Sequence, residues 1–161
     1  TFFVVGHMVT KYPYMVERIY RQGHDLANHT WAHYRLDELS QNQIEQQVDS
    51  VRSLFNFLHI PLVPYMRPPG GRYNNMVLNT LKKQGLTMVM WDVNAADYKR
   101  ENGKFPRPES IVKRVVKQIR PGSIVLMHNS PATVKALPQI IDQIRSQGLT
   151  IGKLRWTPSP I

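Results

Sequence analysis

The chain has 161 residues, which is enough for one domain with a hydrophobic core and too few for two ordinary domains. It contains no cysteine, so disulfides and thiolate metal sites are excluded, and any metal must be held by histidine and carboxylate. The net charge of +10 favours anionic partners, but no apolar run is long enough to span a membrane and no stacking-aromatic or recognition-helix pattern indicates nucleic acid.

Apolar periodicity, bounded by glycine and proline, predicts an alternation of short buried strands and amphipathic helices. The expected strands, in chain order, are 2–5, 65–66, 86–93, 123–127 and 150–152. The expected helices are 9–22, 40–58, 74–84, 108–119 and 131–147. Such alternation favours an α/β fold with a parallel sheet covered by helices, either a barrel or a doubly wound sheet. In both architectures the chemistry is expected at the carboxyl ends of the strands.

Titratable and polar side chains recur where four successive strands end. They are His29, His33, Arg67, Trp91, Asp92, Asn94, Asp97 and His128. Four such groups meeting at one end of a barrel would form an active site. His29 and His33 are four residues apart, a spacing at which two imidazoles can bind one divalent ion and leave a coordination position open. Two histidines at this spacing, taken alone, also often occur where no metal ion is bound.

Five segments together resemble one enzyme family. They are Thr1–Val4 (TFFV), Gly23–His33 (GHDLANHTWAH), Arg67–Gly71 (RPPGG), Asn94–Tyr98 (NAADY) and Leu126–His128 (LMH). Their order and spacing are similar to those of the polysaccharide deacetylases of carbohydrate esterase family 4, which share the nodulation-factor deacetylase homology domain. The resemblance implies an α/β fold, a distorted (β/α) barrel, with one catalytic domain over 1–161.

The resemblance also implies the catalytic and metal-binding roles. His29 and His33 would be ligands of a divalent metal, zinc or a similar ion such as cobalt. Arg67 would orient the catalytic base through a charge-assisted hydrogen bond. Asp97 would pair with His128 and keep its imidazole protonated as the general acid.

Further residues are implied in substrate binding. The Thr30 hydroxyl would brace the loop between the two histidines, and Leu126 would line the pocket for the acetyl methyl group. Tyr73 would offer its backbone amide to the developing oxyanion, and Tyr98 would form an aromatic wall. The whole implied set is Thr30, Pro69, Tyr73, Trp91, Tyr98 and Leu126.

Two departures from the family pattern carry consequences. The family's first motif, T-F-D-D, supplies the catalytic base and a third metal ligand, and it is absent from residues 1–161. It would end a strand one strand–helix unit earlier, roughly 30 residues upstream. We therefore expect an N-terminally incomplete domain that lacks its first strand–helix unit. We also expect this domain to associate with the missing N-terminal segment. In the fourth motif, Asn94 replaces Asp and Tyr98 replaces Trp, so we expect an altered substrate fit.

The resemblance predicts metal-dependent removal of N-acetyl groups from an amino-sugar polysaccharide. Peptidoglycan glycan is the expected substrate because the positive charge suits an anionic wall, and the protein is then expected to act outside the cytoplasm. Chitin oligomers and acetylated xylan are alternative substrates. A catalytically incomplete polysaccharide-binding domain is the alternative function.

Overall fold

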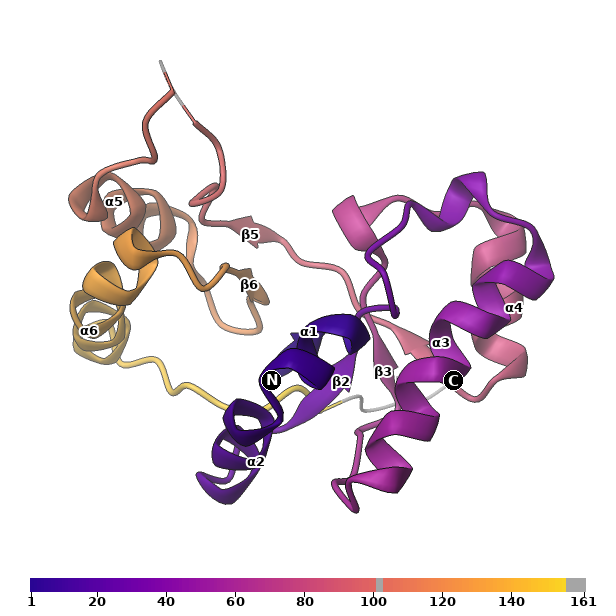
Figure 1. Cartoon of the computed structure of the whole chain (residues 1–161). Helices are drawn as coiled ribbons and strands as arrows, with labels where there is room; N and C mark the ends of the chain where they lie inside the picture. Colours follow the sequence, from indigo (N-terminus) through magenta and orange to yellow (C-terminus); the bar gives the residue numbers. More distant parts are fainter. Residues whose placement is uncertain (101–102, 156–161) are drawn as a thin grey trace. The chain divides into compact units, whose positions relative to one another are not determined.

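The structure, a computed structural model, describes residues 1–100 and 103–155 (Figure 1). The chain divides into two compact units, one formed by Thr1–Val89 with the stretch from Lys153, the other by Met90–Gly152. Among the residues that the structure describes, no helix has the length and apolar character needed to cross a membrane.

The first unit is built on a parallel sheet of four strands in the order β1-β2-β3-β4. The strands are β1 (Phe2–Val4), β2 (Leu26–Asn28), β3 (Tyr65–Met66) and β4 (Thr87–Met88). The register pairs Val4 with Asn28, Asn28 with Met66, and Met66 with Met88. These pairs align the strand ends, so the residues that follow β1, β2 and β3 emerge at the same edge. The predicted parallel sheet is confirmed.

Two helices follow β1 where the sequence predicted one. The structure has α1 (Gly6–Lys11) and α2 (Pro13–Arg21), so the single helix expected over 9–22 is wrong. Pro13 lacks an amide hydrogen and disfavours helical geometry in the residue before it. Tyr12 accordingly has φ −134° and ψ 54°, and the helix restarts with proline at its first position.

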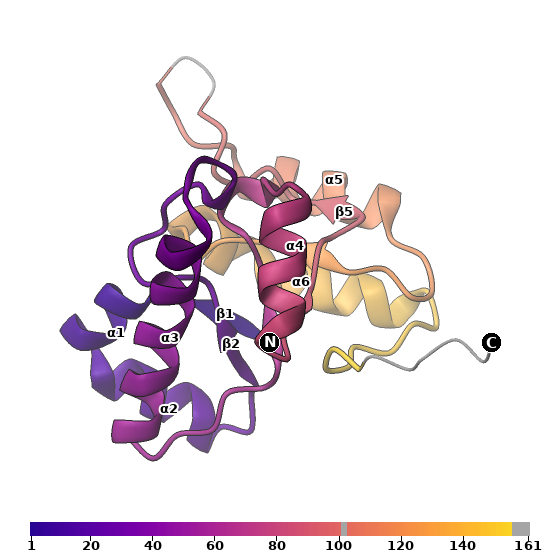
Figure 2. The same cartoon turned by 90° about the vertical axis from the view of Figure 1, so that its right-hand side faces the viewer.

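The capping residues predict the next helices correctly. α3 (Gln41–Phe57) begins at the expected capping box, in which the Ser40 amide donates to Gln43 Oε1 at 2.9 Å. α4 (Asn75–Lys83) begins where Asn74 Oδ1 accepts a hydrogen bond from the Val77 amide at 3.0 Å. α3 packs against β2 and α4 (Figure 2), and α4 packs against β4. Two short 3₁₀ turns, Leu36–Glu38 and Pro69–Gly71, complete this unit.

The second unit contains a parallel pair of short strands and two helices. β5 (Val93–Asn94) pairs with β6 (Val125–Leu126), and α5 (Pro108–Gln118) packs against α6 (Pro131–Ser146). The predicted ends of both helices lie within one residue of the observed ends. Their apolar faces and the strands enclose one core, which contains Val93, Ala95, Ile111, Val112, Val115, Ala136, Ile140 and Ile144.

Two strand predictions are wrong. The strand expected over 86–93 is divided into β4 and β5, which lie in different sheets. The parallel ladder stops after β4 because the Val89 carbonyl accepts a hydrogen bond from the Arg67 side chain at 3.1 Å instead of from a neighbouring strand. The strand expected at 150–152 is not formed, since it has no ladder partner among the described residues and Ile151 is exposed.

Candidate active-site residues

The first candidate cluster begins directly after β2, in the first unit. His29 Nδ1 lies 2.6 Å from the carbonyl oxygen of Arg67. A carbonyl only accepts hydrogen bonds, so Nδ1 carries the hydrogen and Nε2 of the neutral ring carries the lone pair that binds a metal ion. The rings of His29 and His33 have centroids 4.8 Å apart and meet edge to face at 73°. The structure therefore brings the two predicted ligands together and fixes the tautomer of the first.

A sharp turn joins these two histidines. Thr30 has φ 68° and His33 has φ 59°, both in the left-handed region that side chains with a Cβ seldom adopt. The Thr30 hydroxyl accepts a hydrogen bond from the His33 amide at 2.9 Å and so spans the turn. Thr30 itself is 0% exposed, so it contributes to the site through the turn and not by touching a substrate directly.

The two imidazoles fit a divalent metal but do not complete its ligand set. Neutral imidazole nitrogen suits zinc, and a catalytic zinc site ordinarily takes three protein ligands. Within 1–100 and 103–155, no group of three His, Cys, Asp or Glu side chains is placed to hold a metal ion. The described residues therefore offer two nitrogen ligands.

Arg67 lies beside these histidines, at the end of β3. Its side chain is buried, its guanidinium carbon lies 4.2 Å from the centroid of the Phe3 ring, and its Nε donates to Val89 O. Burial lowers the pKa of Arg67 to about 10, which still leaves the guanidinium charged at neutral pH. Pro69 is buried in the turn that follows, while the Tyr73 side chain is 47% exposed.

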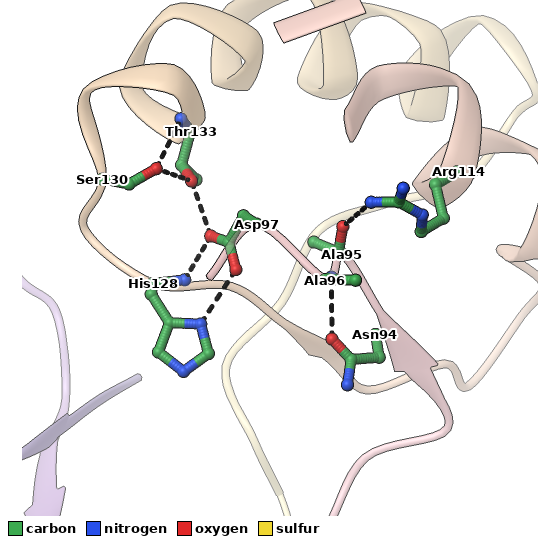
Figure 3. A network of polar contacts seen from close by, with 8 residues as sticks. All are labelled: Asn94, Ala95, Ala96, Asp97, Arg114, His128, Ser130 and Thr133. Carbon is green, nitrogen blue, oxygen red and sulfur yellow. Dashed lines mark hydrogen bonds and ion pairs between the residues drawn. The ribbon is translucent and has the colours of Figure 1, made fainter. Parts of the chain in front are cut away.

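The second candidate cluster lies in the second unit and joins Asp97 to His128 (Figure 3). Asp97 follows β5 and is 0% exposed, whereas the His128 side chain, after β6, is 45% exposed. His128 Nδ1 lies 2.8 Å from Asp97 Oδ1, and the His128 amide donates to Asp97 Oδ2 at 2.6 Å. Thr133, in the first turn of α6, donates its hydroxyl hydrogen to the same Oδ2 at 2.5 Å. A buried carboxylate thus holds an exposed imidazole by its backbone and its ring.

The electrostatics of Asp97 follow from these contacts. Burial by itself raises the pKa of the carboxyl group, because it disfavours the charged form. The hydrogen bonds from His128 and Thr133 favour that form more strongly, so the pKa of Asp97 lies below its ordinary value. The carboxylate is therefore ionised at neutral pH and accepts hydrogen bonds from the ring and the backbone amide of His128.

The backbone between β5 and Asp97 is also held by side chains. Asn94 Oδ1 accepts a hydrogen bond from the Ala96 amide at 2.8 Å, and Arg114 Nη1 donates to the Ala95 carbonyl at 2.5 Å (Figure 3). The Asn94 side chain thus closes a turn. Ala96 has φ 49°, which turns the chain so that Asp97 faces His128.

Three predicted substrate-binding residues lie in this unit. The ring of Tyr98 meets that of His128 edge to face, with centroids 4.9 Å apart, and Tyr98 is 46% exposed. Leu126 is buried at the end of β6, where its carbonyl accepts a hydrogen bond from the Ala95 amide at 3.1 Å. Trp91 is half-buried before β5.

Sequence reasoning missed the side chains that support these clusters. Asn28 and Gln47 hydrogen-bond the histidine turn, and Thr133 supports Asp97. Asn28 directly precedes His29 and could have been noticed there. Gln47 and Thr133 lie 15 and 36 residues from the atoms they contact, and no local pattern marks them.

Comparisons with known proteins relate the chain to one family. Residues 1–89 match the polysaccharide deacetylase family. The chain is 34% identical to a peptidoglycan-N-acetylglucosamine deacetylase of Bacillus cereus, over 92% of this chain and 70% of that protein. It is 33% identical to a peptidoglycan-N-acetylmuramic acid deacetylase of Bacillus subtilis, over 93% and 57% of the two chains. Identity to a chitooligosaccharide deacetylase of Sinorhizobium fredii is 32%, over 96% and 76%.

Solved structures agree with these relatives. A family 4 carbohydrate esterase from Streptomyces lividans in complex with acetate matches with a TM-score of 0.85 and 28% identity, over 95% of this chain and 77% of that one. A family 4 pseudoenzyme from Bacillus anthracis matches with a TM-score of 0.88 and 27% identity, over 95% and 53%. The predicted fold class is confirmed. The chain spans only part of these proteins, 53% in the smallest case.

Proposed function

Because the chain belongs to the polysaccharide deacetylase family, we propose that the protein removes N-acetyl groups from an amino-sugar polysaccharide, the glycan of peptidoglycan. The support for this polymer is that the Bacillus cereus and Bacillus subtilis relatives are named for it. A net charge of +10 also favours association with an anionic wall. Since that wall lies outside the membrane, the proposed site of action is extracytoplasmic.

Both units are assigned to a single catalytic domain over 1–161, of which 101–102 and 156–161 lie outside the described residues. The support is that the likeness to family 4 structures extends over 95% of the chain. Each unit supplies one part of the proposed chemistry.

The observation that most directly supports the proposal is the hydrogen bond between the exposed His128 imidazole and the buried Asp97 carboxylate. In amide hydrolysis, water adds to the acetyl carbon, and the bond from that carbon to the sugar nitrogen then breaks. The leaving amine needs a proton, which the protonated His128 ring gives from Nε2 while Nδ1 stays bonded to Asp97. The products are acetate and a free amino sugar. Residues 1–161 contain no T-F-D-D motif, so the base that takes the proton of water is assigned to none of them.

His29 and His33 are the proposed ligands of a divalent metal ion, and zinc is the proposed ion because both donors are imidazole nitrogens. When bound, the ion would polarise the acetyl carbonyl. The Arg67 carbonyl holds the His29 ring in the tautomer that this requires. The Arg67 guanidinium is proposed to orient the catalytic base, and Tyr98 and Trp91 are proposed to form walls for the sugar.

The remaining proposed roles concern the acetyl group. Leu126 would contact its methyl group, since Leu126 ends β6 just before His128. Pro69 would shape the turn after Arg67, and the Tyr73 amide would donate to the oxyanion that forms when water adds. The Thr30 hydroxyl maintains the turn that carries both ligands.

A second candidate function is polysaccharide binding without catalysis. The observation that favours it is the likeness to a family 4 pseudoenzyme, at a TM-score of 0.88. The two-nitrogen ligand set of the described residues is in line with that function.

Acetate release from three polymers tests the proposal. The complete gene product, supplied with zinc, is incubated with purified wall glycan, chitopentaose and acetylxylan. We expect the fastest release from wall glycan and none from the His128→Ala variant. Release from chitopentaose alone would replace the substrate, and binding of glycan without acetate release would favour the second function.

A further inference from the structure

The turn that carries both proposed ligands is strained. Thr30 is β-branched and yet has φ 68°, and His33 has φ 59°. Left-handed geometry at such residues persists only where the surrounding structure imposes it, and it is concentrated at functional sites. The contacts that impose it therefore decide where the two imidazoles lie.

Helix α3 supplies one of these contacts directly and supports a second through Asn28 of β2. The buried Asn28 side chain donates from Nδ2 to the Val48 carbonyl at 3.0 Å and accepts the Thr30 amide hydrogen at Oδ1, 2.9 Å away. Gln47, on the neighbouring position of the helix, accepts the Ala32 amide hydrogen at Oε1, 2.8 Å away. The Thr30 and Ala32 amides thus depend on acceptors that α3 provides or holds in place. Ala32 lies between Thr30 and His33 in the turn.

Helix α1 holds the other side of the turn. The Gly6 amide donates to the Thr30 carbonyl at 2.9 Å, and the His7 amide donates to the Trp31 carbonyl at 3.0 Å. His7 Nδ1 lies 2.9 Å from the same Trp31 oxygen. The turn is therefore fixed from α1 through its carbonyls and from α3 through its amides.

We propose that α3 sets the distance between the two imidazoles, and that Gln47 is a positioning residue of the metal site. The inference rests on the proposed metal-binding role of His29 and His33. Gln47 touches neither ring, so it acts through the Ala32 amide. Without its acceptor, that partly buried amide loses its partner, and the strained turn relaxes toward other backbone conformations. His33 then spends less time beside His29, and the ion is bound more weakly.

Gln47→Met tests this proposal, because methionine keeps the length and helix propensity of glutamine without the acceptor. Gln47→Glu retains an acceptor at the same place, and Gln46→Met makes the same change at an exposed position of the same helix. Zinc affinity of the complete protein is measured by competition with a chromophoric chelator. We expect zinc binding to weaken about tenfold in Gln47→Met, as when other outer partners of a metal site are removed, and to stay at the wild-type level or above in the two other variants.

Hydrogen exchange of the Ala32 amide provides a readout that does not depend on metal. It should be faster in Gln47→Met than in Gln46→Met, with the circular dichroism spectrum unchanged. Wild-type zinc affinity in Gln47→Met would overturn the inference, whatever the exchange rate. Absence of zinc binding by the wild type would overturn the proposed metal site itself and the inference with it.

Discussion

At the scale of single residues, Asp97 shows how hydrogen bonds keep a buried carboxyl group ionised. Its position after a strand and the pattern it shares with a known family identified it, together with His128, from the sequence. Its other partner residue, Thr133, was not predictable, because the hydroxyl comes from a helix 36 residues away. The motifs thus predicted which two side chains lie together, whereas the group that supports them depends on the folded chain.

Thr133→Val tests that supporting contact. Valine has the shape of threonine without the hydroxyl, so Asp97 loses a hydrogen bond to its charged form, and the unfolding free energy at pH 7 should fall by about 2 kcal/mol. The pKa of Asp97 in the folded wild type lies below its ordinary value, so its contribution to stability is present above roughly pH 4 and is lost as pH falls through the lowered pKa. The variant raises that pKa toward its ordinary value.

The difference in stability between wild type and Thr133→Val should therefore shrink on acidification. Urea unfolding at neutral pH and at about pH 3 measures it. Val134→Thr, the reverse change at an exposed neighbouring position, is the matched control and should change little at either pH. An equal loss at both pH values would show that Thr133 does not act through the charge of Asp97.

Asp97→Asn separates acid catalysis from metal binding. The Asp97 carboxylate holds the His128 ring at Nδ1, so that Nε2 can give its proton to the leaving amine. The amide of asparagine removes the charged acceptor, and turnover on wall glycan should therefore fall. Zinc affinity, measured by competition with a chelator, should barely change. Loss of zinc binding in this variant would instead make Asp97 a ligand.

At the scale of elements, capping residues correctly predicted where helices begin. Apolar periodicity was less successful in predicting whether a helix or strand runs without a break. Ser40 with Gln43, Asn74 and Pro108 begin their helices as expected. The helix expected over 9–22 fails at Pro13, and the strand expected over 86–93 fails where a side chain takes the Val89 carbonyl. The first failure was visible in the sequence, while the second depends on a tertiary contact.

Gly6→Ala tests the packing of α1 against the histidine turn. A Cβ at Gly6 would lie 2.5 Å from Trp31 Cε3 and 3.0 Å from Val51 Cγ2, so the tryptophan must move. We expect a loss of about 1 to 3 kcal/mol in unfolding free energy, as is usual when a packed core receives an extra carbon. At Gly152 a Cβ meets nothing within 4 Å, so Gly152→Ala is the control. The two urea midpoints give the comparison, and equal midpoints would contradict this packing.

At the scale of the whole molecule, the sequence predicted the family but gave no sign of the two compact units. The motifs predicted a polysaccharide deacetylase, and that family is confirmed. One catalytic domain over 1–161 stays a prediction, within which the described chain forms two compact units, with the histidine pair in one and Asp97 with His128 in the other. The boundary between the two units, at Met90, falls within an apolar run that is typical of a single strand. The sequence pattern therefore does not indicate this boundary.

The central claim is that these residues perform metal-dependent deacetylation, and acetate release from wall glycan tests it most directly. The complete protein is stripped of metal with a chelator, assayed, and assayed again after zinc is added back, beside His29→Ala and His33→Ala. We predict no release without metal, recovery on adding zinc to the wild type, and no recovery in either variant. Release by either variant at the wild-type rate would contradict the claim, as would a wild type that stays inactive with zinc present.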